Sequence, residues 1–454
     1  MEKTYWLLEG EKLAAGSFQG TRWDGNCVIL EEGCRSGIYM SPICEERPFQ
    51  KAVASWNSST PEGSSVEIQL RIWRQGEGGE QPSQWYSWGM WGVHIDRKSR
   101  SITEEEAPDE GISMDTDTLS LSGRKALRFQ FRVLFTGEKE SPSLYLLGLT
   151  VPVEKPERNM DSAGLVPWPQ NLPFRAETEV PACSQLLRDP VFARVICSAV
   201  TVQMLTARGT DDFLPEEIAW CNYDSAMDGH GNWSFSTAMA GELGYRAWAA
   251  YLPPEELLWE LAARRPVGVS VRYSNEPDHA KLPYLENAPG NTPGHLLVLY
   301  GYEREGDILW LLAADPYGER NETARRRYRW EHFLKAWSGR LTYLVHEKRQ
   351  GFSQKAIERI PVTFLGKENG EYELFWGKNR LVLEPSEIGS CVLLSAEEAE
   401  NGRLSVCVPF FGSITQRGLL SLPTEAVEYG KNRGPLKGML VDRRGHTYEG
   451  VLGR

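Results

Sequence analysis

Strict alternation of apolar and polar side chains in the first third of the chain is the feature that most constrains its fold. The segment SVEIQLRIW alternates Val66, Ile68, Leu70 and Ile72 with polar neighbours, and ALRFQFRVLF alternates in the same way. A period of two means a strand with one buried face. Turn-rich segments such as RQGEGGEQPSQ separate these strands. We therefore predict an antiparallel β-sandwich of jelly-roll type over residues 1–155.

The pattern changes after residue 155. Residues 156–173 are rich in proline and polar residues and predict a linker. Residues 174–350 combine helix-like spacing at 195–207 and 255–263 with the strand-like runs GVSVRY, HLLVLYGY, ILWLLAA and LTYLVHE. They predict an α+β domain. Residues 351–454 return to strand-like runs and predict a small C-terminal β domain, so the whole chain is multidomain.

Length and charge exclude several classes of protein. A chain of 454 residues is too long for one core. The net charge of −12 disfavours a general binder of nucleic acid. No segment reaches the roughly 20 apolar residues needed to span a bilayer. The first residues lack the apolar core of a secretory signal, so a cytoplasmic location is favoured.

The eight cysteines contain no CxxC spacing, which disfavours a zinc ribbon, and we expect neither a metal nor a cofactor. Cys27, Cys34 and Cys44 cluster near the N-terminus, and Cys391 and Cys407 lie in adjacent strand-like runs. Either group could form a disulfide in an exported protein. Buried free thiols are favoured because no signal is visible.

Four residues occur in the order that a thiol catalyst requires. Cys197 lies early in the helix-like run VICSAVTVQML, where helix-end amides and a nearby imidazolium would lower its pKa. His295 enters a buried strand and would take the cysteine proton. Asp315 ends the next strand and would orient the histidine. Gln185 would donate an amide N–H to the oxyanion.

Other residues of the same types compete for these roles. A lone cysteine in such a helix is most often a small core residue. Cys183 lies in an extended segment, and Cys221 has no apolar helix after it, so both are expected to be structural. His230 and His279 lie in polar loops, where an exposed histidine needs no function. Only the order and the conjunction of Gln185, Cys197, His295 and Asp315 favour catalysis.

These residues and their surroundings resemble a known family. Residues 180–337 are similar to the papain-like cysteine peptidases of the bacteriocin-processing, double-glycine leader type, in their stand-alone branch. The matching segments are VPACSQ, VICSAVTVQML, the helix-like NWSFSTAMAGELGY, PVGVSV, GHLLVLYGY and DP. The resemblance implies a papain-like fold and thiol-dependent cleavage of an amide bond. It gives Gln185, Cys197, His295 and Asp315 the family's oxyanion, nucleophile, base and orienting roles.

The sequence departs from the family at two places. Ser198 stands where the family commonly has glycine, and Gln185 precedes Cys197 by 12 residues, a longer spacing than in papain-type enzymes. The transporter-linked role of the family is not implied, since the chain shows neither a membrane span nor a P-loop. A peptide or peptidoglycan-like substrate is implied, and Trp233 and Gly294 are predicted to contact it.

Two further readings stay open. The chain could be a catalytically inactive peptidase-like binding protein, which would have Cys197 and His295 too far apart for a hydrogen bond. It could instead be a thiol acyltransferase of the transglutaminase kind, which shares the order of Cys, His and Asp.

Aromatic and acidic residues outside the triad suggest contacts with partners. In the first domain, Trp85, Tyr86, Trp88 and Trp91 could stack on a glycan or simply pack. Two long polar loops near the site carry carboxylates that predict an acidic rim with a preference for basic substrate groups. The carboxylates are Glu216, Glu217, Asp224, Asp228, Glu276, Asp278 and Glu286.

Overall fold

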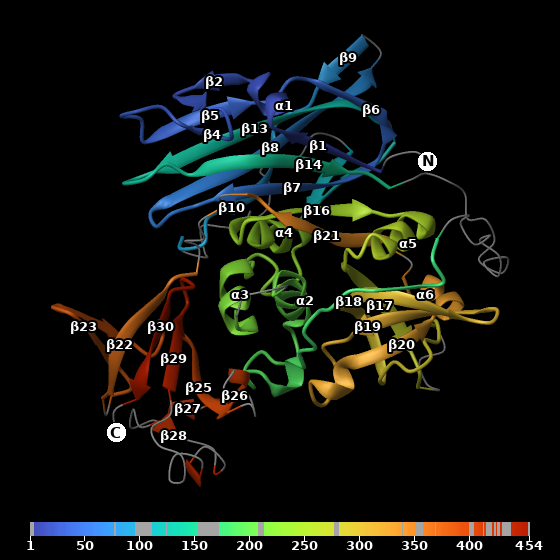
Figure 1. The fold of residues 1–454 in the computed structure, drawn as a ribbon. Helices are drawn as coiled ribbons and strands as arrows, with labels where there is room; N and C mark the ends of the chain where they lie inside the picture. The colour runs from blue at the N-terminus through green and yellow to red at the C-terminus, as the bar shows by residue number, and fades with distance from the viewer. Residues whose placement is uncertain are drawn as a thin grey trace.

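The computed structural model describes residues 4–76, 79–95, 111–123, 125–152, 172–207, 213–276, 281–337, 339–350, 352, 357–367, 369–398, 404–411, 413–414, 420–421, 424, 427–428 and 437–452. Figure 1 shows three parts: a β-sandwich in blue and teal, an α+β domain in green and yellow, and a β-sheet in orange and red. Of the expected linker at 156–173, only residues 172 and 173 are among these.

The N-terminal part consists of two antiparallel sheets of seven strands each. The first has the order β11 (Ile112–Asp115), β12 (Thr118–Leu121), β7 (Lys51–Ser59), β14 (Ser143–Thr150), β4 (Val28–Leu30) and β3 (Thr21–Trp23), and β1 (Tyr5–Glu9) also pairs with β14. The second has the order β10 (Tyr86–Trp91), β8 (Ser64–Gly76), β13 (Ala126–Gly137), β5 (Ser36–Met40) and β2 (Ser17–Gln19); β6 (Cys44–Phe49) pairs with β13 and β9 (Gly79–Pro82) with β8. The short helix α1 (Glu11–Ala14) follows β1.

The alternating segments of the sequence form the centre of the second sheet. In the register of β8 and β13, Leu70 faces Phe131 and Ile68 faces Val133. These four side chains are fully buried. The apolar face that the period of two predicted is therefore the inner face of the sandwich. The jelly-roll description of the strand order stays a prediction.

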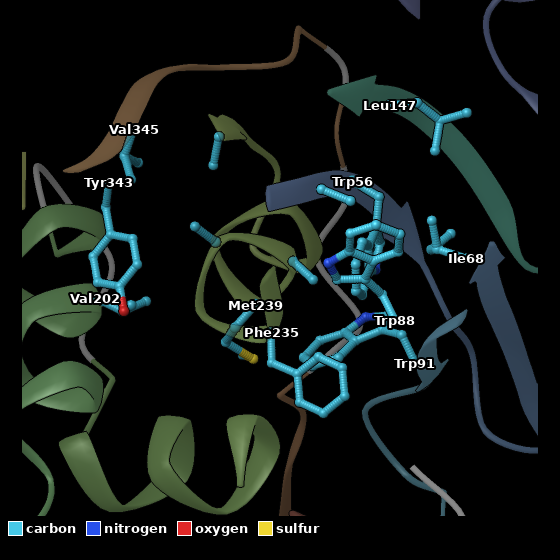
Figure 2. Packing of buried hydrophobic residues seen from close by; sticks show 14 of the residues in the cluster. Trp56, Ile68, Trp88, Trp91, Leu147, Val202, Phe235, Met239, Tyr343 and Val345 are labelled. Atoms are coloured by element: carbon cyan, nitrogen blue, oxygen red, sulfur yellow. The ribbon is translucent and has the colours of Figure 1, made fainter. Parts of the chain in front are cut away.

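The core of the sandwich continues into the α+β domain (Figure 2). The rings of Trp56 on β7 and Trp91 on β10 lie 6.4 Å apart, and both contact Phe235 of the α+β domain, at 6.1 and 5.4 Å. Trp88 is also buried. Of the four aromatic residues that suggested glycan stacking, Tyr86, Trp88 and Trp91 therefore pack in the core.

The central domain is built on a seven-stranded antiparallel sheet. Its order is β16 (Tyr245–Tyr251), β21 (Leu341–Lys348), β17 (Val267–Ser274), β18 (Asn291–Glu305), β19 (Ile308–Ala314) and β20 (Arg325–Arg329), and β15 (Arg175–Glu177) pairs with β18. Its helices are α2 (Cys197–Thr206), α3 (Pro215–Asn222), α4 (Trp233–Glu242), α5 (Pro254–Ala262) and α6 (Trp330–Ala336), with 3₁₀ turns η3 (Gln185–Leu187) and η5 (Glu322–Ala324).

Strand β16 is an element that the sequence interpretation missed. The helix-like segment that begins at Trp233 ends at Glu242, and Gly244 follows with a φ of +90°. A side chain at Gly244 would lie 2.3 Å from the ring of Phe352. Glycine therefore ends the helix here and allows Tyr245 to begin a strand.

The C-terminal part is a fourth seven-stranded sheet that packs beside α3. Its order is β24 (Asn379–Leu383), β23 (Tyr372–Trp376), β22 (Arg359–Gly366), β30 (Thr447–Leu452), β29 (Lys437–Asp442), β25 (Ile388–Glu398) and β26 (Leu404–Phe411), and only β22 and β30 are parallel. Strands β27 (Ser413–Ile414) and β28 (Leu420–Ser421) pair separately. The Trp220 indole on α3 donates to Ser390 Oγ at 2.8 Å, which joins the sheet to the central domain.

The seven cysteines whose side chains the structure describes are free thiols, and Cys34 is the exposed one. Within the described ranges, none of the helices is long and apolar enough to cross a membrane.

Candidate active site

Cys197 is the first residue of α2 and is partly buried. Burial opposes ionisation of its thiol, but the hydrogen bond and charge of His295 and the backbone N–H groups of Leu296 and Ser198 hold its pKa below the usual 9.0. The thiolate is therefore stabilised by groups from two elements, α2 and β18.

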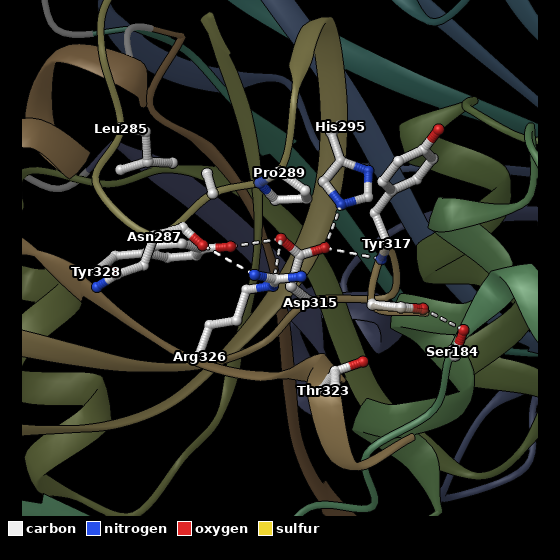
Figure 3. Close-up of polar contacts among 12 residues, drawn as sticks. Ser184, Leu285, Asn287, Pro289, His295, Asp315, Tyr317, Thr323, Arg326 and Tyr328 are labelled. Carbon is white, nitrogen blue, oxygen red and sulfur yellow. Dashed lines mark hydrogen bonds and ion pairs between the residues drawn. The ribbon is translucent and has the colours of Figure 1, made fainter. Parts of the chain in front are cut away.

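His295 lies in β18 and is buried between Cys197 and Asp315. Its Nε2 lies 2.7 Å from Asp315 Oδ1 (Figure 3). The other ring nitrogen, Nδ1, is therefore left for the interaction with Cys197. Burial alone would lower the pKa of His295. The charge and hydrogen bond of Asp315 and the interaction with Cys197 outweigh it and raise the pKa to about 10. Both shifts favour the ion pair of thiolate and imidazolium over the neutral pair.

Asp315 follows β19 directly and is fully buried. Its Oδ1 accepts the backbone N–H of Tyr317 at 2.8 Å, and its Oδ2 accepts the hydroxyl of Tyr328. Arg326 Nε lies 3.9 Å from Oδ2. Although burial raises the pKa of Asp315, the charge of His295 and these donors hold it below its usual range.

Tyr328 and Arg326 were missed in the sequence interpretation. They lie two residues apart in β20, and β20 pairs with β19 so that Tyr328 faces Leu311 and Arg326 faces Ala313. Residues two apart share one face of a strand. The alternation in RRRYRW indicates that Arg326 and Tyr328 lie on one face of a strand. That this face contacts Asp315 could not be predicted without the register of β19 and β20.

Gln185 lies beside the triad in spite of its long spacing. Its backbone N–H donates to Pro316 O at 2.8 Å, and its side-chain Nε2 donates to Ala193 O at 2.9 Å. The intervening residues fold back as a turn in which Asp189 O accepts the N–H groups of Phe192 and Ala193. The additional residues are therefore taken up next to the site, and one of the two side-chain N–H groups of Gln185 has no acceptor among the described residues.

Ser198, the departure from the family pattern, is buried and donates its hydroxyl to His230 O. His230 is itself buried, so the expectation that it is an exposed loop residue is wrong. This bond ties the first turn of α2 to the loop before α4. The hydroxyl at position 198 thus has a structural partner away from the thiol.

The two predicted substrate contacts differ in their surroundings. Gly294 precedes His295 and is exposed, and a side chain placed there would have no heavy atom within 4 Å. Trp233 begins α4, where its ring packs against Tyr343 at 4.4 Å and its N–H donates to Asp117 Oδ2 at 2.5 Å. Space for a substrate is therefore present at Gly294, whereas Trp233 is engaged at the junction with the sandwich.

The competing cysteines are buried away from this arrangement. Burial raises the pKa of Cys183 to about 11. Cys221 is fully buried near the end of α3, which stops at Asn222, so no helix follows it directly, as expected. His279 lies outside the described residues.

The predicted acidic rim is wrong for three of its carboxylates, because they are buried. Glu216 is paired with Arg188 at 2.9 and 2.6 Å, and Glu217 with Arg359 at 3.1 Å. Asp224 accepts from Asn232 Nδ2 at 2.7 Å. Asp278 lies outside the described residues, and the rest make polar contacts near the surface: Asp228, Glu276 and Glu286. These carboxylates therefore stabilise the fold.

Two family descriptions match the chain. Residues 29–151 match the "Peptidase C39 N-terminal domain", and residues 177–343 match the "Peptidase_C39 like family". The second range contains Gln185, Cys197, His295 and Asp315. No curated protein matches the chain.

Several solved structures are similar to parts of the chain. A putative C39-like peptidase from Bacillus anthracis is 15% identical, covers 38% of this chain and 100% of its own, and has a TM-score of 0.27. Digestive procathepsin L 3 from Tenebrio molitor larval midgut is 12% identical and has a TM-score of 0.27. The match covers 39% of this chain and 71% of the procathepsin chain. A structure concerning the mite allergens Blo t 1 and Der p 1 is 10% identical and has a TM-score of 0.28. The match covers 43% of this chain and 75% of the allergen chain.

Proposed function

Because this chain carries a peptidase domain of the C39-like family joined to a C39 N-terminal domain, we propose that it is a cysteine peptidase or amidase. Cys197 is the nucleophile, His295 the base and acid, Asp315 the orienting carboxylate, and Gln185 an oxyanion donor. The observation that carries the proposal is His295, which lies between the thiol at the start of α2 and the buried carboxylate of Asp315. Its Nε2 lies 2.7 Å from Asp315 Oδ1, and the imidazole lowers the pKa of the Cys197 thiol.

The reaction divides into acylation and deacylation. The Cys197 thiolate attacks the carbonyl carbon of the amide, and the negative charge moves to the carbonyl oxygen. Gln185 and the backbone N–H of Cys197 stabilise that oxygen, and one such donor is worth about 10²–10³ in rate. His295 gives its proton to the leaving amine, and the C–N bond breaks. A water molecule, deprotonated by His295, then hydrolyses the thioester and restores the thiolate–imidazolium pair.

Two alternatives are less well supported. An inactive binding protein would have Cys197 and His295 beyond hydrogen-bond reach, whereas His295 is close enough to the thiol to lower the pKa of Cys197. Acyl transfer to an amine would use the same residues, and no feature of the site favours an amine over water. Product analysis with and without an added amine separates hydrolysis from transfer.

The substrate that fits the proposal is a peptide or the peptide part of a peptidoglycan-like polymer. Contact with a glycan through the sandwich would depend on Trp85, since its three aromatic neighbours are buried. The Trp85 ring lies against the guanidinium groups of Arg71 and Arg132, at 4.7 and 4.4 Å. The Trp85 ring is therefore already engaged by two charged side chains.

The test uses an internal reference thiol. Cys34 is free and exposed and serves as the ordinary thiol of the same molecule. Iodoacetamide at mildly acidic pH should alkylate Cys197 much faster than Cys34, as measured by mass spectrometry of both peptides. A peptide library should be cleaved by the wild type and by Cys34→Ala but not by Cys197→Ala. Equal alkylation rates together with cleavage by Cys197→Ala would refute the proposal.

A further inference from the structure

A cavity of about 570 Å³ lies on one face of the C-terminal sheet, a part of the chain that neither family description covers. Its apolar lining comes from four strands, β22, β23, β24 and β30: Ile360, Trp376, Leu381, Leu383 and Tyr448. The rings of Trp376 and Tyr448 lie 6.4 Å apart and are tilted by 49°. A volume of this size holds a few amino-acid residues or a small ligand.

Charged side chains of both signs surround this apolar floor. Glu387 comes from the turn before β25, Arg443 and Arg444 come from the β29–β30 turn, and Glu62 comes from the N-terminal sandwich. Within the described ranges, none of these four side chains has an ion-pair partner. Glu387 Oε2 accepts the backbone N–H of Glu384 at 2.9 Å, and Arg443 Nε donates to Ile388 O at 3.5 Å. Carboxylates and guanidinium groups without a described ion-pair partner around one cavity favour a ligand that carries both an ammonium and a carboxylate group.

The cavity is held rigidly against the catalytic domain. Asp442 accepts the backbone N–H groups of Arg444 and His446 at 2.8 and 2.9 Å and contacts His446 Nδ1 at 2.9 Å, so the β29–β30 turn is fixed. Gly445 in this turn has a φ of +88°, and a side chain there would lie 2.8 Å from Cys221 Sγ on α3. The His446 ring stacks on His94 of the sandwich at 4.3 Å. All three parts of the chain therefore meet at the β29–β30 turn, which forms one side of this cavity.

We propose that this cavity is a second peptide-binding site, which holds a segment with one large apolar side chain flanked by a basic and an acidic residue. The inference rests on the proposed peptidase function, because the bound segment would belong to the substrate chain. A peptide is favoured over a sugar because three aliphatic side chains share the floor with the two rings. Sugar sites depend on exposed ring faces and on neutral hydrogen-bonding groups.

Binding is tested without catalysis, in the full chain carrying Cys197→Ala. The probe is a fluorescein-labelled hexapeptide with a central phenylalanine, a lysine on one side and an aspartate on the other. Fluorescence anisotropy should show saturable binding. A hexapeptide with serine for phenylalanine should have a Kd at least about tenfold higher, because the large apolar contact with the floor is lost. The variant Glu387→Lys with Arg444→Glu should also raise the Kd of the probe at least about tenfold, because charge-assisted contacts are lost.

Two results would overturn the proposal. One is an equal Kd for both hexapeptides, or an equal Kd of the probe for the proteins with and without the charge exchange. The other is saturable binding of an N-acetylglucosamine tetrasaccharide with no binding of the peptide probe. Binding is measured in Cys197→Ala and does not depend on cleavage. If this variant binds the probe while the wild type cleaves no peptide, only the peptidase function is contradicted.

A kinetic measurement links the cavity to the active site. In the wild type, KM for a long peptide carrying the probe motif should rise when Glu387 and Arg444 are exchanged, with kcat unchanged. A dipeptide amide is too short to reach a second site and should show the same KM in both proteins. An equal rise of KM for both substrates would mean that the exchange disturbed the active site, which would contradict a separate site.

Discussion

Tyr328 fixes the second oxygen of the buried carboxylate in the triad, and its removal should change proton chemistry more than folding. Burial and the charge of Asp315 raise the pKa of Tyr328 well above 10, so its hydroxyl remains a donor at all working pH values. In Tyr328→Phe, Asp315 should hold His295 less firmly. We expect kcat/KM to fall by about tenfold or more, since a hydrogen bond to a charged group is lost. The alkaline limb of the pH profile should move to lower pH.

The matched control is Tyr302→Phe. Tyr302 lies in the same sheet and donates its hydroxyl to Pro173 O at 3.0 Å, away from Asp315. Both substitutions remove one buried hydroxyl, so both should lower thermal stability. Only Tyr328→Phe should shift the pH limb. An unchanged limb in Tyr328→Phe would mean that the tyrosine has a structural role alone.

The pH dependence of hydrolysis follows from the two pKa shifts in the triad. Activity needs the thiolate and the imidazolium together. This form appears as pH rises through the pKa of Cys197, which lies below 9.0, and is lost as His295 deprotonates near its raised pKa of about 10. We expect a bell-shaped plot of kcat/KM against pH with its plateau below pH 9. A rate that increases only above pH 9 would show that Cys197 reacts as an ordinary thiol.

Helix α2 places the thiol, and Ser198 in its first turn ties that helix to the loop before α4. Ser198→Gly restores the residue common in the family but removes the hydroxyl bound to His230 O. We expect a loss of about 1–2 kcal/mol in the free energy of unfolding, from one hydrogen bond and the flexibility of glycine. Hydrolysis should persist, because the hydroxyl faces away from the thiol.

Ser198→Ala separates the two contributions, because it removes the hydrogen bond and keeps the helix propensity. Its stability, measured by urea unfolding, should lie between those of the wild type and Ser198→Gly. A variant Ser198→Gly with the stability of the wild type would show that the tie to His230 contributes nothing.

The local sequence pattern correctly predicted those features of the helices and strands that depend on residues adjacent in the sequence. The strands β8 and β13 follow from their alternation, and Cys197, His295 and Asp315 were placed from the ends of their own elements. The contact of Tyr328 with Asp315 depends on the register of β19 and β20, which no local pattern gives. The acidic-rim prediction failed because burial of Glu216 and Glu217 depends on Arg188 and Arg359, which come from distant segments.

The sandwich and the catalytic domain share one core, and α4 is the element through which they are joined. At its end, Glu242 is fully buried and accepts hydrogen bonds only from the sandwich among its described partners. Ser58 Oγ and Thr60 Oγ1 donate to Oε1 at 2.8 Å, Trp91 Nε1 donates to Oε1 at 2.9 Å, and Thr60 N donates to Oε2 at 3.0 Å. The N-terminal domain is thus part of the support of the catalytic domain.

Glu242→Ala should therefore destabilise both domains together. It leaves buried donors of Ser58, Thr60 and Trp91 without an acceptor, and each unsatisfied group costs about 1–3 kcal/mol. We expect a loss of about 3–5 kcal/mol in the free energy of unfolding. The tryptophan fluorescence of the sandwich and the loss of hydrolysis should follow one transition. Two separate transitions, with hydrolysis retained after the first, would show that the domains are independent.

Glu242→Gln tests the contribution of charge at the same place. Burial raises the pKa of Glu242, in spite of its four donors, so the folded state binds a proton more tightly than the unfolded state. The stability that this proton gives is complete below the ordinary value of 4.5 and is lost as pH rises through the raised pKa. Glutamine keeps one acceptor oxygen and cannot ionise. The difference in stability between the variant and the wild type should therefore shift in favour of the variant as pH rises from acidic to neutral. A difference that stays constant with pH would mean that Glu242 titrates alike in both states, and that burial at the domain junction does not raise its pKa.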